Sequence, residues 1–173
     1  MQCFAKSDRG AVRKENQDRA AGARIRRKGC VVGVVCDGMG GAAGGKLASE
    51  LAASTFLAQF RREMMAGSAV ESAMRAACDA ANQAVYGRAC ADPELRGMGT
   101  TIVAACVRHG RLTVLHVGDS RAYLVGLRRM QQITTDHSLV QELIASGQVL
   151  PEQAMPVIEL SRSFEQDYTR GLF

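Results

Sequence analysis

Residues 34–49 read VVCDGMGGAAGGKLAS, and this stretch decides the fold. It completes an apolar run, CVVGVVC at residues 30–36, which is rich in valine and predicts a buried strand ending at Asp37. The glycines that follow are too frequent for regular structure, so we expect a loop there. From Lys46 to about Met65, apolar residues recur at helical spacing. Strand, glycine loop and helix therefore follow one another directly.

A second helix is expected over residues 70–85, because Val70, Met74, Ala77, Ala81 and Val85 keep the helical period. Ser68 and Glu71 have the spacing of a capping box at its start.

Three short strands are expected next, at residues 100–108, 112–117 and 121–125. Turns of a few residues join them, so they must be antiparallel, because a parallel return needs a crossover of about a dozen residues or more. A short helix is expected over residues 138–146, closed by Gly147. A strand, two helices and then antiparallel strands indicate an α+β fold.

Length and composition narrow the class of protein. The 173 residues fit one domain, and 47% hydrophobic with 23% charged residues excludes wholesale disorder. The net charge of +5 is scattered, aromatic residues make up 5% and tryptophan is absent, so we expect no nucleic-acid partner. No stretch of about 18 apolar residues occurs, and the start has no signal core, so we expect no membrane span and no secretion.

The six cysteines include no C-x-x-C pair, which excludes a zinc ribbon and a thioredoxin motif. Cys36 and Cys106 lie inside apolar runs, where a free thiol packs as a small hydrophobic group. This cysteine usage indicates a reducing, cytoplasmic location.

The glycine loop imitates two nucleotide-binding motifs without matching either. Gly40, Gly45 and Lys46 have P-loop spacing, but Leu47 stands where that motif needs a hydroxyl for magnesium. A dinucleotide fingerprint belongs in a βαβ unit of about 30 residues, and here two helices precede the next strand. A nucleotide-binding protein is therefore the weakest of three hypotheses.

Acidic residues at the borders of predicted strands point to metal chemistry. Asp37 and Asp119 each end an apolar strand, and Asp18 follows the polar segment at residues 7–17. A buried strand end rarely leaves a carboxylate unpaired, because an unpaired charge in a low dielectric is costly. Oxygen-only clusters of carboxylates suit magnesium or manganese better than zinc.

Taken together, the motifs resemble the type 2C (PPM) family of metal-dependent serine/threonine protein phosphatases, in its bacterial branch. They occur in family order: SDRGAVRKENQD (7–18), VVCDGMGGAAGGKLAS (34–49), GMGTTIV (97–103), LHVGDSRAYLV (115–125) and TTDHSLVQELIASGQVLPEQA (134–154).

The resemblance implies a four-layer α-β-β-α sandwich and a two-metal site. Asp37 would bridge two Mn²⁺ or Mg²⁺ ions, and the Gly38 carbonyl would ligate one of them. Asp18 would hold a water on the metal, with help from Gln17, and Asp119 would bind an additional third ion. Arg13 would bind the substrate phosphate, because its planar guanidinium group can donate two hydrogen bonds to the phosphate oxygens. Arg13, Asp18 and Asp37 are thus the expected catalytic residues.

The resemblance extends to about residue 154. The family's later strands carry two further aspartates in a DG and a DN element, and residues 155–173 do not follow that pattern. We therefore expect a single but incomplete phosphatase domain over residues 1–173, with C-terminal strands missing or altered. A pseudophosphatase that binds a phosphoprotein or partner without hydrolysis is the second hypothesis.

The resemblance also implies partners. Phosphoproteins would be the substrates of a signal-transduction hydrolase, with serine/threonine kinases or their targets as partners, and we expect a monomer.

Overall fold

The computed structural model describes residues 2–136 and 157–160. The elements in chain order are β1 (Asp18–Ile25), η1 (Arg26–Lys28), β2 (Cys30–Met39), α1 (Gly41–Ala66), α2 (Val70–Ala91), η2 (Pro93–Leu95), β3 (Gly99–Thr100), β4 (Ile102–Arg108), β5 (Arg111–Val117), β6 (Tyr123–Val125), β7 (Met130–Gln132) and β8 (Val157–Leu160).

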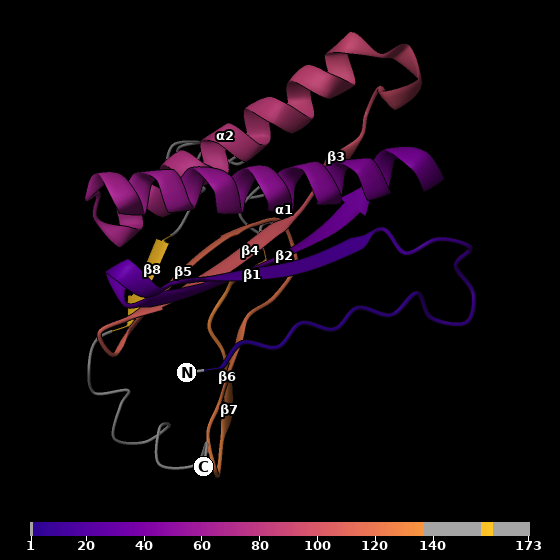
Figure 1. The fold of residues 1–173 in the computed structure, drawn as a ribbon. Helices are drawn as coiled ribbons and strands as arrows, with labels where there is room; N and C mark the ends of the chain where they lie inside the picture. Colours follow the sequence, from indigo (N-terminus) through magenta and orange to yellow (C-terminus); the bar gives the residue numbers. More distant parts are fainter. Residues whose placement is uncertain (1, 137–156, 161–173) are drawn as a thin grey trace, which may run out of the picture.

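One antiparallel sheet carries the fold. Its strand order is β1-β2-β4-β5-β8, and β3 pairs with the end of β2. Helices α1 and α2 lie together on one face of this sheet (Figure 1). The α+β class is confirmed, and the described residues supply one helical layer and one large sheet of the expected four-layer arrangement.

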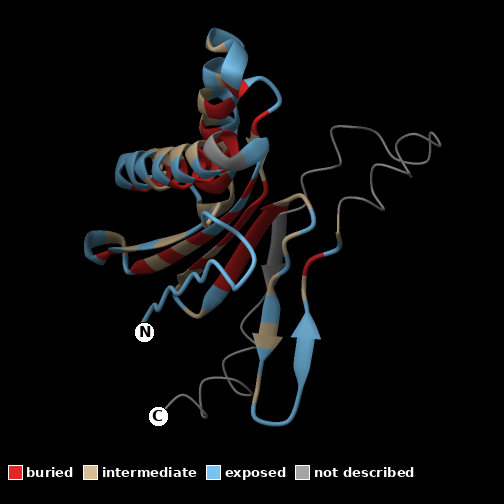
Figure 2. Cartoon of the chain, turned by 90° about the vertical axis from the view of Figure 1, so that its right-hand side faces the viewer, coloured by how far each residue is buried: buried red, intermediate tan, exposed pale blue. Residues whose placement is uncertain are grey.

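The core lies between the helices and the sheet, as the buried segments in Figure 2 show. Alternate residues of β2 point toward the helices and are buried, whereas the residues between them are more exposed. The helices pack large apolar side chains against this face, and Phe56, Phe60 and Met74 are fully buried. Period-2 burial in the strand and helical spacing in α1 and α2 are what the apolar pattern predicts. Cys36 and Cys106 are buried free thiols, also as predicted.

The start of α1 corrects the expectation of a glycine loop. The helix begins at Gly41, inside the GAAGG stretch, and β2 continues to Met39 rather than ending at Asp37. A Cβ atom on Gly38 would lie 1.9 Å from the carbonyl oxygen of Gly45. The glycines therefore let the first turns of α1 pack directly against the end of β2, and close packing replaces the irregular loop.

Strand β1 has no counterpart among the predicted elements. DRAAGARI has few of the residues that favour strands, and its pairing with the apolar β2 decides its structure. The capping box does not form: α2 has Ala69 as its N-cap, and the Ser68 hydroxyl instead donates a hydrogen bond to Glu63 at 2.8 Å.

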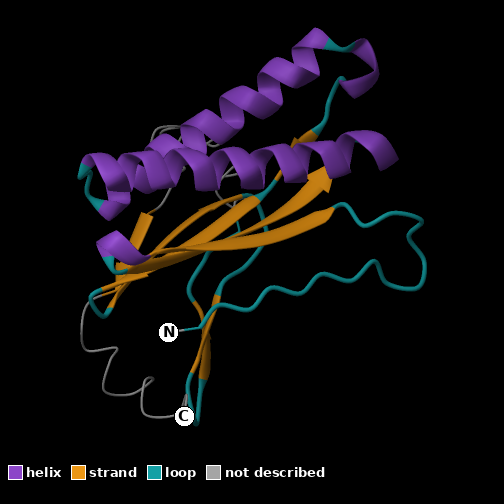
Figure 3. Ribbon diagram, viewed as in Figure 1, coloured by secondary structure: helices purple, strands orange, loops and turns teal. Residues whose placement is uncertain are grey.

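The predicted antiparallel strands are confirmed for β4 and β5, which a turn at His109 and Gly110 connects. The third predicted strand does not extend this sheet. It corresponds to β6, which pairs with β7 in a separate two-stranded hairpin (Figure 3). The helix expected at residues 138–146 lies outside the described residues. Within the described part of the chain, neither long helix is apolar enough to cross a bilayer.

Candidate active site

Asp18 and Asp37 lie opposite each other at the end of the sheet where α1 begins. They are the first residue of β1 and a residue near the end of β2, and the register of the two strands makes them direct Cα partners. Directly opposed residues in an antiparallel pair have side chains about 5 Å apart on the same face. The sheet register therefore places the two carboxylates side by side.

Neighbouring charged side chains shift the pKa of Asp37. Its carboxyl group is partly desolvated in the cleft, and this desolvation, together with the charge of Asp18, raises the pKa of Asp37. Protonated Asp37 donates a hydrogen bond to Asp18, which favours the neutral form further. Asp119 adds repulsion, whereas the Arg13 guanidinium opposes the rise. Three of the predicted charged residues thus act on the fourth, Asp37.

A cleft of about 650 Å³ opens over the carboxylate pair. The polar N-terminal loop and the junction of β2 with α1 form its walls, and Arg13, Asp18 and Asp37 line it together with Gly38 and Met39. Arg13 is exposed on this loop. The cleft therefore offers two carboxylates and a guanidinium to a ligand from solvent.

Backbone hydrogen bonds hold the Asp37 segment in place. The N–H of Asp37 donates to the Thr101 hydroxyl at 3.0 Å, and the N–H of Thr101 donates to the Asp37 carbonyl at 2.9 Å. The Thr100 hydroxyl also donates to this carbonyl, at 2.9 Å. Residues 99–101 belong to the GMGTTIV motif of the sequence, but their positioning role emerges only from the structure.

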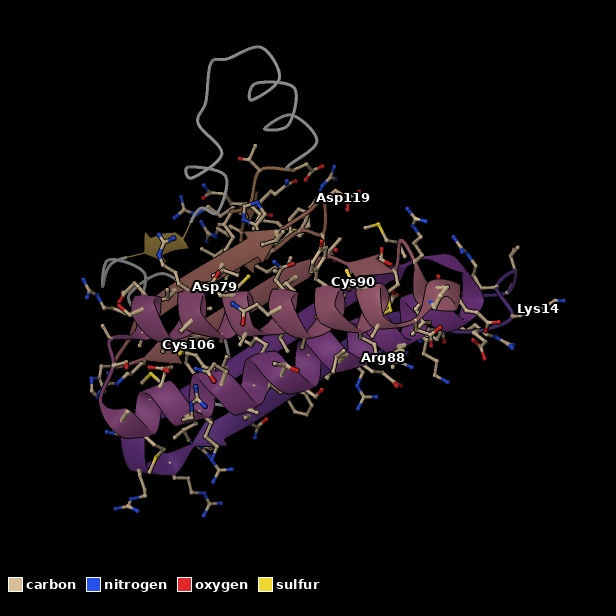
Figure 4. The ribbon with its side chains drawn as sticks, turned by 90° about the horizontal axis from the view of Figure 1, so that it is seen from above. Lys14, Asp79, Arg88, Cys90, Cys106 and Asp119 are labelled. Atoms are coloured by element: carbon tan, nitrogen blue, oxygen red, sulfur yellow. The ribbon has the colours of Figure 1, made fainter. Side chains whose placement is uncertain are left out.

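Asp119 reaches the site through the turn after β5. Gly118 has φ +101°, and a Cβ atom there would meet the Thr101 side chain at 2.7 Å, so the turn depends on glycine. Ser120, which follows Asp119, has its hydroxyl 2.7 Å from that of Thr101. Figure 4 shows Asp119 at this turn and Lys14 projecting outward from the N-terminal loop.

Gln17 joins the N-terminal loop to the helix. Its side-chain amide donates to the Gly41 carbonyl at 2.7 Å, and its own carbonyl accepts from the Gly38 N–H at 3.2 Å. The Gly38 carbonyl, predicted as a metal ligand, lies 2.8 Å from the position that a Cβ on Gly45 would occupy. Its role as a ligand stays a prediction.

His116 of β5 is fully buried, and its Nε2 lies 2.7 Å from the Thr135 carbonyl. His137 lies outside the described residues.

Comparison with known proteins gives the family. The family model "Protein phosphatase 2C" matches residues 10–150 of the chain. The chain belongs to the protein phosphatase 2C family. The serine/threonine protein phosphatase PstP of Mycobacterium tuberculosis is 39% identical over 151 residues, which are 87% of this chain and 28% of PstP. The serine/threonine phosphatase stp of Listeria monocytogenes is 34% identical over 157 residues, 90% of this chain and 62% of stp. The chain thus spans less than two thirds of the length of these two relatives.

Solved structures of the family share the fold. A crystal structure of M. tuberculosis PstP gives a TM-score of 0.69 at 32% identity, covering 90% of this chain and 72% of that one. The PstP catalytic domain in complex with two manganese ions gives 0.68 at 33% identity, covering 90% and 71%. The 2C phosphatase fold predicted from the motifs is therefore confirmed.

Proposed function

We propose that the chain is a metal-dependent phosphatase that hydrolyses phosphoserine and phosphothreonine esters in proteins. The observation that carries the proposal is the register pair Asp18–Asp37 with the Arg13 guanidinium beside it. Carboxylates in contact repel each other until a cation binds them, and a guanidinium nearby attracts an anion. A site with two adjacent carboxylates and a nearby guanidinium is therefore suited to binding a metal ion together with a phosphate ester.

The donor set fits a divalent cation. Asp18 and Asp37 supply hard oxygen ligands. Desolvation and the charge of Asp18 raise the pKa of Asp37, and a bound cation would offset both effects. Asp119 lies close enough to add to that repulsion. Mn²⁺ is the first candidate, because the homologous PstP structure holds two manganese ions, and Mg²⁺ is the second. The Gly38 carbonyl is the further oxygen that we propose for this site.

The chain's own residues then have distinct tasks. Asp18 and Asp37 would hold the cations, which when bound would supply a nucleophilic water at neutral pH and neutralise phosphate charge. Arg13 binds two oxygens of the phosphate and orients the ester for in-line attack. Attack by water on phosphorus breaks the bond to the serine or threonine oxygen, which leaves with a proton as the free hydroxyl.

The proposal is tested by measuring hydrolysis of p-nitrophenyl phosphate by the 173-residue chain in excess Mn²⁺. The Asp37→Asn variant is assayed in parallel. Manganese titration by isothermal calorimetry gives a second readout that does not depend on turnover. We expect turnover and manganese binding in the native chain, and a large loss of both in Asp37→Asn. Turnover that persists unchanged in Asp37→Asn would show that the site lies elsewhere.

A binding role without hydrolysis is the second candidate, and one observation favours it. Among the described residues, no group of three or more His, Cys, Asp or Glu side chains is arranged to hold a metal ion. A site with this few carboxylates would bind cations weakly, although Arg13 could still bind phosphate. Binding of a phosphopeptide without turnover in saturating Mn²⁺ would identify this role.

The cellular setting belongs to the same proposal. All six cysteines are free thiols, which supports a reducing cytoplasm. We propose phosphoproteins made by serine/threonine kinases as substrates, a place in signal transduction, and a monomeric state.

A further inference from the structure

A second cleft lies beside the proposed active site, on the other side of the N-terminal loop. It measures about 320 Å³ and is bounded by the loop, the start of β1 and the first turns of α1. Arg9, Lys14, Glu15, Asn16 and Asp18 line both this cleft and the cleft over the carboxylate pair. The two clefts therefore share one wall, so a bound peptide can occupy both at once.

Positive side chains slightly outnumber acidic ones in the second cleft. Four cations line it, Arg9, Lys14, Arg19 and Lys46, beside three acids, Glu15, Asp18 and Glu50. The lining therefore carries an excess of one positive charge.

These cations are not neutralised by ion pairs. Among the residues that the structure describes, no ion pair involves Lys14, Arg19 or Lys46; Arg88–Asp92 and Arg121–Asp136 lie elsewhere. Positive side chains that are not held in ion pairs remain available to an anionic ligand in this concave surface.

Hydrogen bonds within the N-terminal loop organise the shared wall. The Arg9 guanidinium donates to the Lys14 carbonyl at 3.1 Å, and the Asn16 amide donates to the Ser7 hydroxyl at 2.7 Å. The N–H of Asp18 donates in turn to the Asn16 side-chain oxygen at 3.0 Å. A preorganised loop lowers the entropic cost of binding, so modest charge contacts on it yield measurable selectivity.

We propose that this second cleft binds an anionic group of the substrate protein close to the phosphoresidue, either an acidic side chain or a second phosphate. The proposal rests on the phosphatase function above, because that function places a phosphoresidue at Arg13. Lys46 and Arg19 are the residues that would select such substrates, and neither belongs to the proposed metal or phosphate site.

Peptide binding in EDTA, where no metal-dependent hydrolysis occurs, tests this directly. Three fluorescent phosphothreonine peptides are compared by anisotropy at low salt: one flanked by glutamates, one flanked by glutamines and one with a second phosphothreonine. We expect the glutamate peptide to bind about 10-fold more tightly than the glutamine peptide, since several exposed charge contacts each add a small factor. The doubly phosphorylated peptide shows whether a carboxylate or a phosphate is the preferred anion.

Variants locate the effect. Lys46→Gln and Arg19→Gln are each expected to weaken binding of the glutamate peptide about two- to fivefold, as for an exposed charge pair, and to leave the glutamine peptide unchanged. Arg61→Gln, an exposed cation later on the same helix, is the matched control and should change nothing. Protection of Lys46 from acetylation by the glutamate peptide checks the contact in the unmutated chain.

Equal affinity for the glutamate and glutamine peptides would overturn the inference, as would an equal effect of Arg61→Gln and Lys46→Gln. Hydrolysis of p-nitrophenyl phosphate, which carries no flanking acid, is followed separately in Mn²⁺. Absence of this hydrolysis would contradict the phosphatase function. The preference for the glutamate peptide, and the loss of that preference in Lys46→Gln, test the anion site independently.

Discussion

The hydroxyl of Thr101 accepts a hydrogen bond from the backbone N–H of Asp37 at 3.0 Å, across a sequence separation of 64 residues. The same hydroxyl lies 2.7 Å from that of Ser120, beside Asp119. One buried threonine therefore joins the strand that ends near Asp37 to the turn that carries Asp119. The relative placement of these two acids depends on it.

Thr101→Val should destabilise the chain by about 1–3 kcal/mol, because the shape is kept while the partly buried Asp37 N–H loses its acceptor. The free energy of unfolding in urea measures this. Thr113→Val is the matched control, since Thr113 is also buried but makes no hydroxyl hydrogen bond within the described residues. Equal effects of the two substitutions would show that burial alone accounts for the loss. We further expect weaker manganese binding in Thr101→Val only.

Gly38→Ala should be strongly destabilising, by about 3 kcal/mol or more, because overpacking at this contact forces β2 and α1 apart. The added Cβ would lie 1.9 Å from the Gly45 carbonyl oxygen. Gly87→Ala is the control: no atom lies within 4 Å of its added Cβ. It lies inside α2, so alanine should stabilise the chain by up to about 1 kcal/mol. Thermal unfolding compares the two, and a tolerated Gly38→Ala would contradict the close packing.

Asp37→Asn should raise the melting temperature in EDTA at neutral pH. The pKa of Asp37 is raised in the folded chain by desolvation and by Asp18, so the ionised form weakens the fold. Stability of the native chain should therefore rise as the pH falls through this raised pKa toward the ordinary value of about 3.9. The advantage of Asp37→Asn should shrink over the same window. Manganese should stabilise the native chain and not the variant; a pH-independent difference would contradict this account.

Asp136→Asn should loosen the β6–β7 hairpin at neutral pH. Arg121 donates hydrogen bonds to both oxygens of Asp136, at 2.6, 2.9 and 3.1 Å, and these bonds lower the pKa of Asp136. The stabilisation is present above the ordinary carboxyl pKa and is lost as the pH falls through the lowered one.

Hydrogen exchange at the Ile133 N–H, which donates to the Ala122 carbonyl at 2.9 Å, reports on this hairpin. Faster exchange in Asp136→Asn at pH 7, with no difference at strongly acidic pH, is expected. High salt should reduce the difference, because the pair is exposed to solvent.

The local pattern of apolar residues was sufficient to predict the type of some helices and strands. The alternation of buried residues in β2 and the helical spacing around Phe56 and Phe60 gave the correct element types, because burial on one face imposes those periods. The ordered motifs also predicted the family. The pattern failed at β1 and at GAAGG, where intrinsic propensity opposed a structure that neighbouring segments stabilise.

The sequence by itself determined that Asp37 and Asp119 lie at the ends of apolar runs, because each acid follows its run closely in the chain. Only the tertiary structure decided that Asp18 faces Asp37, that Thr101 bridges to Ser120, and that two clefts share the N-terminal loop. Strand register and loop closure depend on pairing between distant segments, and the free energy that selects one pairing comes from burying the whole sheet against α1 and α2.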